Sequence, residues 1–239
     1  PYLKEHKPNS DWLNKEIPTP VLSRLVDELA ELGVERIRFT GGGEPLLHSD
    51  ILDVIESAGR KKIKVSLTTK GLILTKQTIG RLIQSELDEL CVSLWSCYKD
   101  KPALENMKLL VDARGLKHKM PRVTFAFVMA RDNASEFLEF VDMAIRYRAD
   151  ALYFTVPDVF KGETDRMVLT PEQAKGLLAQ TIVVTKKCAD AKINLEFFDG
   201  FCRRLSADVP GEYDAKIIDK TVCSIGWTFS RILADGTVL

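Results

Sequence analysis

The feature that most constrains the fold is a regular alternation of helix-like and strand-like segments, which starts near residue 19. Short runs rich in β-branched and aromatic residues recur, separated by longer segments whose apolar residues follow helical spacing. The expected strands begin at residues 36, 63, 90, 123, 151 and 193. Strands separated by a whole helix are typical of a parallel sheet with right-handed crossovers. The sequence therefore predicts an α/β fold, either a partial barrel or a doubly wound open sheet.

Two helix boundaries carry specific signals. Thr19 is expected to be the N-cap of the first helix, and Gly33 is expected to end it. Thr170 and Gln173 have the spacing of a capping box, which predicts the start of a later helix.

Alternation along the expected strands gives the sheet two different faces. One face carries aliphatic residues such as Val65 and Leu67, which we expect to pack under helices. The residues expected on the other face are Arg38, Thr40, Ser66, Thr68, Ser93, Trp95, Tyr153 and Thr155. Buried polar groups need partners, and a barrel filled only for stability uses branched aliphatic residues. The pattern indicates an interior cavity for a ligand or water, with a solvated face of edge strands as the alternative.

Composition argues against several kinds of partner. The 34 basic residues balance the 34 acidic ones, so no overall field attracts nucleic acid or an anionic membrane. No apolar run reaches the roughly 18 residues that a membrane span needs, and the start of the chain lacks the apolar core of a signal peptide. The five cysteines form no CxxC pair. We expect a cytoplasmic protein with no membrane or nucleic-acid partner.

The most specific motif is TGGGEPLL at residues 40–47, between an expected strand and an expected helix. Gly41, Gly42 and Gly43 permit positive φ angles and allow a ligand to approach backbone N–H and C=O groups. Glu44 adds a carboxylate at the carboxyl end of a strand, where α/β active sites lie, and an ammonium group is its natural partner. A tight turn with an exposed Glu44 is the alternative.

The GGGEP segment resembles the GGEP motif of radical S-adenosylmethionine (SAM) enzymes, in which this turn binds the amino group of SAM. The resemblance continues in TTKG at residues 68–71, where Lys70 replaces the usual Asn, and in VSLW at residues 92–95. It covers roughly residues 35–160 and implies a partial (β/α)6 TIM-like barrel with parallel strands over residues 1–200. The SAM-binding residues that it implies are Gly41, Gly42, Gly43, Glu44, Thr68, Ser93, Arg131, Asn133 and Val156.

The same resemblance implies an enzyme that reductively cleaves SAM to methionine and a 5'-deoxyadenosyl radical, which abstracts hydrogen from a substrate. It also implies a [4Fe-4S] cluster and an electron donor such as flavodoxin or ferredoxin. The cluster's CxxxCxxC loop is expected upstream of Pro1, because the chain reads as an excerpt. No general acid or base is assigned, since hydrogen abstraction needs none.

Residues 201–239 are expected to form a linker and the start of a β-hairpin extension. The segment RILADGTVL at residues 231–239 predicts two short strands joined by an Asp-Gly turn. Together with Cys223 it resembles the start of a SPASM or twitch extension, which implies an auxiliary [4Fe-4S] cluster with Cys223 as a ligand. Such extensions accompany peptide modification, so a peptide or protein substrate is implied.

Two other functions remain open at this point. A cluster-free α/β-barrel lyase or aldolase could hold a phosphate at the glycine-rich turn, although Glu44 has the wrong charge for that ligand. A catalytically inactive binding scaffold is the second alternative.

Overall fold

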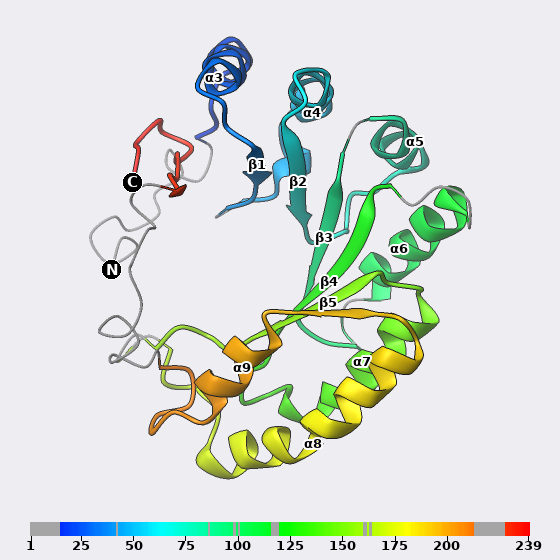
Figure 1. Ribbon diagram of the computed structural model, residues 1–239, viewed down its shortest axis with the longest axis vertical. Coiled ribbons are helices and arrows are strands. Elements are labelled where there is room, and N and C mark those ends of the chain that lie inside the picture. Colours follow the sequence, from blue (N-terminus) through cyan, green and yellow to red (C-terminus); the bar gives the residue numbers. More distant parts are fainter. Residues whose placement is uncertain are drawn as a thin grey trace.

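The molecule is built on one open sheet of six parallel strands with helices between them (Figure 1). The computed structural model describes residues 15–41, 43–85, 87–97, 99, 101–115, 120–159, 162, 164–212 and 228–239. The strands are β1 (Arg36–Phe39), β2 (Lys64–Thr69), β3 (Glu89–Leu94), β4 (Arg122–Val128), β5 (Ala151–Thr155) and β6 (Asn194–Glu196). The helices are α3 (Thr19–Glu31), α4 (Ile51–Arg60), α5 (Lys76–Gln84), α6 (Lys101–Arg114), α7 (Phe137–Arg146), α8 (Pro171–Asp190) and α9 (Phe198–Leu205), with short 3-10 helices η1 (Pro45–Leu47) and η2 (Ala134–Glu136).

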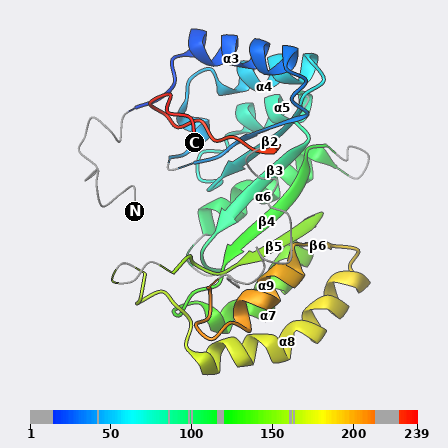
Figure 2. The same ribbon diagram turned by 60° about the vertical axis from the view of Figure 1, so that its left-hand side comes forward.

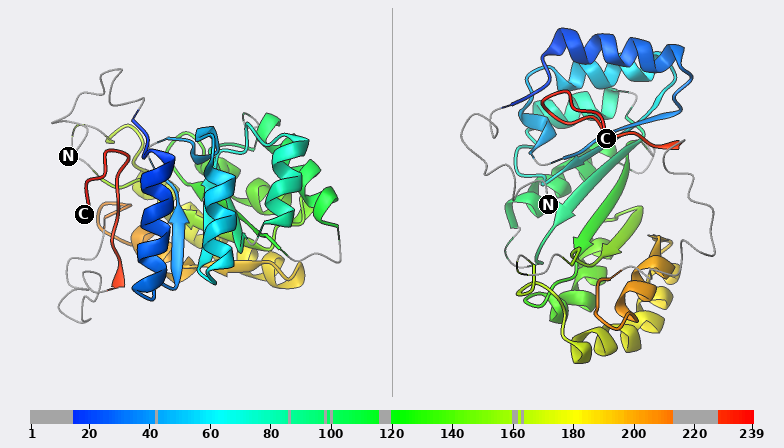
Figure 3. Two further views of the ribbon diagram at one scale, coloured as in Figure 1. Left: turned by 90° about the horizontal axis from the view of Figure 1, so that it is seen from above. Right: turned by 90° about the vertical axis from the view of Figure 1, so that its left-hand side faces the viewer.

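The strand order separates the two architectures that the sequence left open. Each strand pairs in parallel with the next one along the chain, so the order is β1-β2-β3-β4-β5-β6. A doubly wound sheet reverses its strand order at a switch point, and this sheet does not. Helices α3 to α8 lie along its outer side, and the inner, concave face opens away from them (Figures 1 and 3). The fold is the predicted partial TIM-like barrel.

The outer face of the sheet forms the core. Val65, Leu67, Val92 and Leu94 are buried under the helices, as predicted from their alternation. An aromatic cluster continues this core at the β4 and β5 side. Its ring pairs are Phe127 with Phe140, Phe137 with Phe154, and Phe154 with Phe201. Because Phe201 belongs to α9, these contacts fix α9 against β5 (Figure 2).

The inner face carries the predicted polar residues that lie within strands, whereas Thr40 and Trp95 follow the ends of β1 and β3. Laterally paired residues of a parallel sheet share a face, and the register aligns Arg38 with Ser66 and Thr68 with Cys91. Ser93 aligns with Ala126, which in turn aligns with Tyr153. Arg38 is exposed, and its Nε donates to Ser66 Oγ at 3.3 Å.

The helix signals gave two confirmed predictions and one wrong one. Gly33 has a φ of 74° and follows the C-cap Leu32, so it ends α3 as predicted. The capping box of Thr170 and Gln173 is present at the start of α8. Thr19 is not an N-cap, because it already lies inside α3 and Pro18 occupies the cap position. Its hydroxyl instead donates to Asp50 Oδ2 at 2.5 Å, which ties α3 to the residue before α4.

The end of the chain forms the predicted Asp-Gly turn, with an isolated bridge in place of the two predicted strands. Ile232 and Val238 make an antiparallel bridge, and Gly236 between them has a φ of 85°. Asp235 Oδ1 accepts a hydrogen bond from the Thr237 N–H. Among the described helices, none combines the length and apolar character that crossing a bilayer requires.

Candidate SAM-binding site

The glycine-rich turn presents Glu44 between the ends of two strands. After β1 the chain passes through Gly41, which has a φ of 147° that favours glycine. A Cβ atom at Gly41 or at Gly43 would meet no described atom within 4 Å. Glu44 Oε2 accepts the N–H of Lys70 at 2.8 Å, and Oε1 accepts the N–H of Leu46 at 3.2 Å. The carboxylate is therefore held by backbone donors from two neighbouring loops, beside open space.

The TTKG turn after β2 is fixed from both sides. Thr69 is buried, and its Oγ1 accepts the N–H of Gly71 at 3.0 Å. Asn106 on α6 donates from Nδ2 to the carbonyl oxygen of Gly71 at 2.9 Å. Thr68, predicted to bind SAM, lies half-buried on the inner face in register with Cys91. Asn106 was not predicted, because its partner comes from a loop 35 residues away.

The segment after β3 is held by an acidic side chain that the sequence analysis also missed. Glu136 of η2 accepts a hydrogen bond from Ser96 Oγ at 2.9 Å and from the Cys97 N–H at 2.6 Å. Trp95 Nε1 donates to Asp132 Oδ2 at 3.4 Å. Ser93, one of the predicted SAM contacts, is half-buried and has no hydrogen-bond partner among the described residues. Its hydroxyl is available to a ligand.

Asn133 has a different environment from the one that the resemblance implied. Only 1% of its surface is exposed. Its Nδ2 donates to the carbonyl oxygens of Trp95 and Val128, and its Oδ1 accepts the N–H of Ala130. The amide thus joins the loops after β3 and β4. Direct contact of Asn133 with SAM stays a prediction, and the observed contacts indicate a positioning role.

Arg131 and Val156 lie at the ends of β4 and β5. Arg131 is exposed, and its Nε donates to the carbonyl oxygen of Val168 at 2.9 Å. Val156 is 3% exposed as a whole residue and belongs to the hydrophobic core. Pro157 is half-buried and Asp158 is exposed, so a ligand at this strand end would meet these two residues, and direct contact of Val156 with SAM stays a prediction.

The inner face also carries an ionic network that the sequence analysis did not identify. Arg122 Nη1 lies 3.2 Å from Glu89 Oε1 and forms a second ion pair with Glu196. Thr124 Oγ1 donates to Glu89 Oε1 at 2.6 Å. Burial, with a smaller contribution from Glu89, raises the pKa of the neighbouring Cys91 thiol to about 12. The alternation of side chains along a strand could have placed Glu89 and Glu196 on this face. Their pairing with Arg122 could not have been predicted, because it depends on the tertiary fold.

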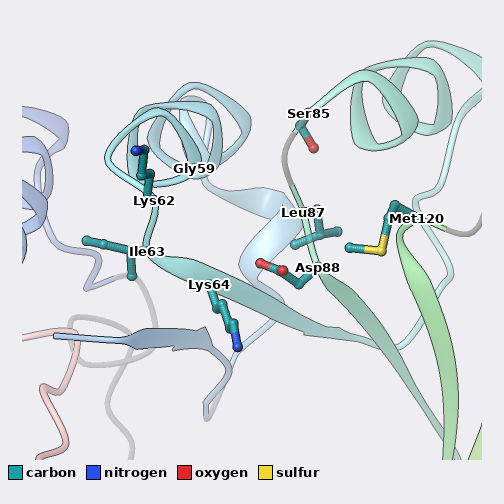
Figure 4. Close-up of a pocket in the computed structure, with 8 residues that line it drawn as sticks. All are labelled: Gly59, Lys62, Ile63, Lys64, Ser85, Leu87, Asp88 and Met120. Carbon is teal, nitrogen blue, oxygen red and sulfur yellow. The ribbon is translucent and has the colours of Figure 1, made fainter.

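A separate hollow lies at the opposite ends of the strands (Figure 4). It measures about 360 Å³ and is lined by Lys62, Lys64 and Asp88 among others. Asp88 Oδ2 is already hydrogen-bonded to the Val65 N–H at 2.6 Å. Because α/β active sites lie at the carboxyl ends of strands, this hollow is not part of the candidate site.

Comparison with known protein families shows to which family the barrel belongs. The family model of the radical SAM superfamily matches residues 4–170, well over half of the chain. The chain belongs to the radical SAM superfamily. Members of this superfamily use SAM and a [4Fe-4S] cluster, so the resemblance carried by GGGEP is confirmed.

Curated radical SAM relatives catalyse more than one reaction. The chain is 27% identical over 137 residues to the PqqA peptide cyclase of Granulibacter bethesdensis, covering 54% of this chain and 36% of the relative. It is 32% identical over 131 residues to the GTP 3',8-cyclase of Limosilactobacillus fermentum, covering 50% of this chain and 38% of the relative. The chain thus spans less than half the length of these relatives.

Solved structures show the same fold. SuiB of Streptococcus suis superimposes with a TM-score of 0.67 at 17% identity, over 91% of this chain and 52% of SuiB. SuiB has also been solved bound to SAM and bound to the precursor peptide SuiA. At this level of identity the likeness establishes the fold alone.

The described residues fit one of the two superfamily cofactors. Each Glu44 oxygen accepts one backbone hydrogen bond and retains a lone pair for an ammonium group, beside the open space at Gly41 and Gly43. The described residues contain no group of three or more His, Cys, Asp or Glu side chains placed to hold a metal. Gly42 and Cys223, predicted to contact SAM and iron, lie outside the described residues. The site therefore fits SAM, while the cluster ligands stay a prediction.

Proposed function

We propose that this chain binds SAM across the carboxyl ends of β1 to β5 and belongs to an enzyme that modifies a peptide or protein by hydrogen abstraction. The observation that carries the proposal is the Glu44 carboxylate, fixed by the N–H groups of Lys70 and Leu46 next to an open glycine turn. A carboxylate positioned before the ligand arrives binds an ammonium group without an ordering cost at that moment.

The remaining roles follow from position. Ser93 offers to the ribose or carboxylate of SAM a hydroxyl that has no hydrogen-bond partner in the part of the chain that the structure describes. Arg131 offers a guanidinium at the neighbouring strand end. Thr68 lies on the inner face between these residues and Glu44. Glu136 and Asn133 would act indirectly, because they hold the loops that carry Trp95 and Ser96.

The chemistry comes from the cofactor. When SAM is bound and receives an electron, its cleavage supplies the 5'-deoxyadenosyl radical that abstracts hydrogen from the substrate. The chain's own contribution is to orient SAM and to keep water away from the radical. The polar inner face around Tyr153 and Arg38 is where the substrate would enter.

A peptide substrate is supported by the relatives. The PqqA peptide cyclase acts on a peptide, as its name states, and SuiB binds the precursor peptide SuiA. An electron donor of the flavodoxin or ferredoxin type and an auxiliary cluster held by Cys223 belong to the same proposal.

The phosphate-binding lyase receives no support from the geometry. A phosphate at the turn after β1 would need the free N–H groups at the start of the following helix. Glu44 accepts the Leu46 N–H of η1, so a carboxylate already occupies that position.

The test is SAM cleavage by the full-length protein, purified without oxygen and supplied with iron, sulfide and a strong reductant. We expect 5'-deoxyadenosine to form, and we expect Glu44→Gln to weaken SAM binding by about tenfold or more, since a charge-assisted hydrogen bond is lost. Glu139→Gln, on the exposed surface of α7, is the matched control and should bind SAM like the wild type.

Three outcomes would change the interpretation. Unchanged SAM affinity in Glu44→Gln would remove this residue from the site. SAM binding without 5'-deoxyadenosine, in protein shown to contain its cluster, would favour an inactive binding scaffold. No SAM binding by the wild type would contradict the proposal altogether.

A further inference from the structure

Arg204 reaches from α9 to the carboxyl end of β5. Its Nη1 donates to Thr155 Oγ1 at 3.2 Å, and its Nη2 donates to the carbonyl oxygen of Pro157 at 3.2 Å. The same Nη2 forms an ion pair with Asp158 at 2.9 Å, and only 11% of the Arg204 side chain is exposed. One guanidinium thus contacts three of the four residues from 155 to 158.

Gly211 closes this arrangement from the other side. Its carbonyl oxygen accepts hydrogen bonds from Nε of Arg204 at 3.1 Å and from Nη2 at 2.7 Å. Its N–H donates to the carbonyl oxygen of Arg204 at 2.9 Å. A Cβ atom at Gly211 would lie 2.9 Å from the carbonyl oxygen of Pro157, and its φ is 103°. Only glycine allows the chain to pass this close to the end of β5.

The helix that carries Arg204 has a fixed position. Phe201, one turn earlier on α9, is 2% exposed and packs against Phe154 with ring centroids 5.8 Å apart. Phe198 packs against Phe154 and Phe201. Because α9 cannot shift without opening this aromatic cluster, the guanidinium is held in place, and it holds the segment 155–158 in turn.

The contact with Pro157 sets the direction of one peptide group. In a trans peptide the C=O and the next N–H point in opposite directions. When the Pro157 carbonyl points to Arg204, the Asp158 N–H is directed away from it. Val156 is buried as a whole residue, whereas Pro157 is half-buried and Asp158 is exposed, so these two residues are what a planar ring at this strand end can contact.

We infer that Arg204 is a positioning residue for the adenine end of SAM, which the resemblance to radical SAM enzymes places beside the strand end at Val156 and Pro157. The inference rests on the proposed function, and it goes beyond it by assigning to α9 and Gly211 the task of shaping the purine-binding backbone after β5. Arg204 does not contact the cofactor in this assignment. It sets the position of Pro157 and Asp158, which do.

Two ligands separate this role from that of Glu44. SAM has both an ammonium group and an adenine, whereas 5'-deoxyadenosine has only the adenosine half. In anaerobic calorimetry on the full-length protein, Arg204→Met should weaken the binding of both ligands by about tenfold, because the segment that contacts the adenine is no longer held in place. Glu44→Gln should weaken SAM and leave 5'-deoxyadenosine unchanged. Arg24→Met, which removes an exposed arginine of α3, should leave both affinities unchanged.

A kinetic readout distinguishes positioning from general damage. In Arg204→Met the KM for SAM should rise while kcat at saturating SAM stays close to the wild-type value, because the site is displaced rather than destroyed. Arg204→Lys retains one charged donor for Pro157 or Asp158 and should recover part of the affinity.

The outcomes can be told apart. If the wild type binds SAM but folded Arg204→Met binds both ligands equally well, the inference is overturned and the proposed function stands. If the wild type binds no SAM, the proposed function fails first. If Arg204→Met does not fold, Gly211→Ala is the second variant, because its Cβ atom displaces Pro157 directly. It should weaken the binding of both ligands. Wild-type affinity in Gly211→Ala would overturn the inference.

Discussion

Arg122 of β4 forms an ion pair with Glu196 of β6, past the intervening strand β5. On β5, Ala151 lies on the same inner face, in register with Thr124 of β4 and Asn194 of β6. Its small side chain leaves room for the side chains of Arg122 and Glu196 to meet. Arg122 also pairs with Glu89 of β3. One side chain therefore ties three strands of the curved sheet together.

We expect Arg122→Met to lower the free energy of unfolding by about 1–3 kcal/mol, because it leaves two partly buried carboxylates without their cation. The side chains of Glu89 and Glu196 are 10% and 22% exposed, so water compensates only partly. The measurement is urea unfolding followed by tryptophan fluorescence.

Arg81 provides the matched control. It also pairs with two carboxylates, Asp53 and Glu56, which are 64% and 32% exposed on the outer helices. Arg81→Met should cost less than about 1 kcal/mol. Equal losses in the two variants would contradict a special role for the inner network.

Two glycines should respond in opposite ways to alanine. Gly71 has a φ of 74°, and a Cβ atom there would lie 3.3 Å from Val92 Cγ1 and 3.4 Å from Ala103 Cβ. Gly71→Ala should therefore destabilise the protein by about 1–2 kcal/mol. Gly80 lies inside α5, and a Cβ atom there would meet nothing within 4 Å. Gly80→Ala should stabilise by about 0.5–1 kcal/mol. Melting temperatures that shift in the same direction would refute this pair of expectations.

The cysteine thiols should react slowly in the folded protein. Burial raises the pKa of Cys91 to about 12 and that of Cys188 to about 11. Both thiols are protonated at pH 8, and the thiolate is the nucleophile. Iodoacetamide followed by peptide mass spectrometry should find both unlabelled in native protein and labelled in urea. Rapid native labelling of Cys91, which is only partly buried, would count against its raised pKa.

The same shift has a consequence for stability. The unfolded chain loses the Cys91 proton above its ordinary pKa of 9.0, while the folded chain keeps it up to about pH 12. The unfolded state then binds fewer protons, so this group lowers the stability as the pH rises through that window and has no effect below it. Cys91→Ala should show a smaller loss of stability between pH 9 and 11 than the wild type.

Patterns among residues close in sequence predicted the positions of the strands and the start of α8. The strands lie within about two residues of their expected positions, because alternation and apolar runs report burial directly. The capping box at Thr170 was found because both of its residues are close in sequence. Thr19 was misassigned because the preceding Pro18 can end the extended segment, and the hydroxyl of Thr19 has a distant partner in Asp50.

The candidate site was predicted only in part for the same reason. Glu44 was identified from a short motif, and its two backbone donors agree with a binding role. Arg204, Glu136 and Asn106 bind loops that are 35 to 49 residues away, and no pattern in the sequence connects them. Asn133 shows the converse case, in which a residue at a typical binding position is occupied by the protein's own backbone.

The hydrogen bond between Glu44 and residue 70 also explains a departure noted in the sequence. The donor is the main-chain N–H of Lys70, so the interaction is indifferent to the side chain that residue 70 carries. Any amino acid with a main-chain N–H satisfies Glu44 equally well, and proline alone would not. The side chain at position 70 can therefore vary, and lysine in place of asparagine in TTKG leaves the hydrogen bond to Glu44 unchanged.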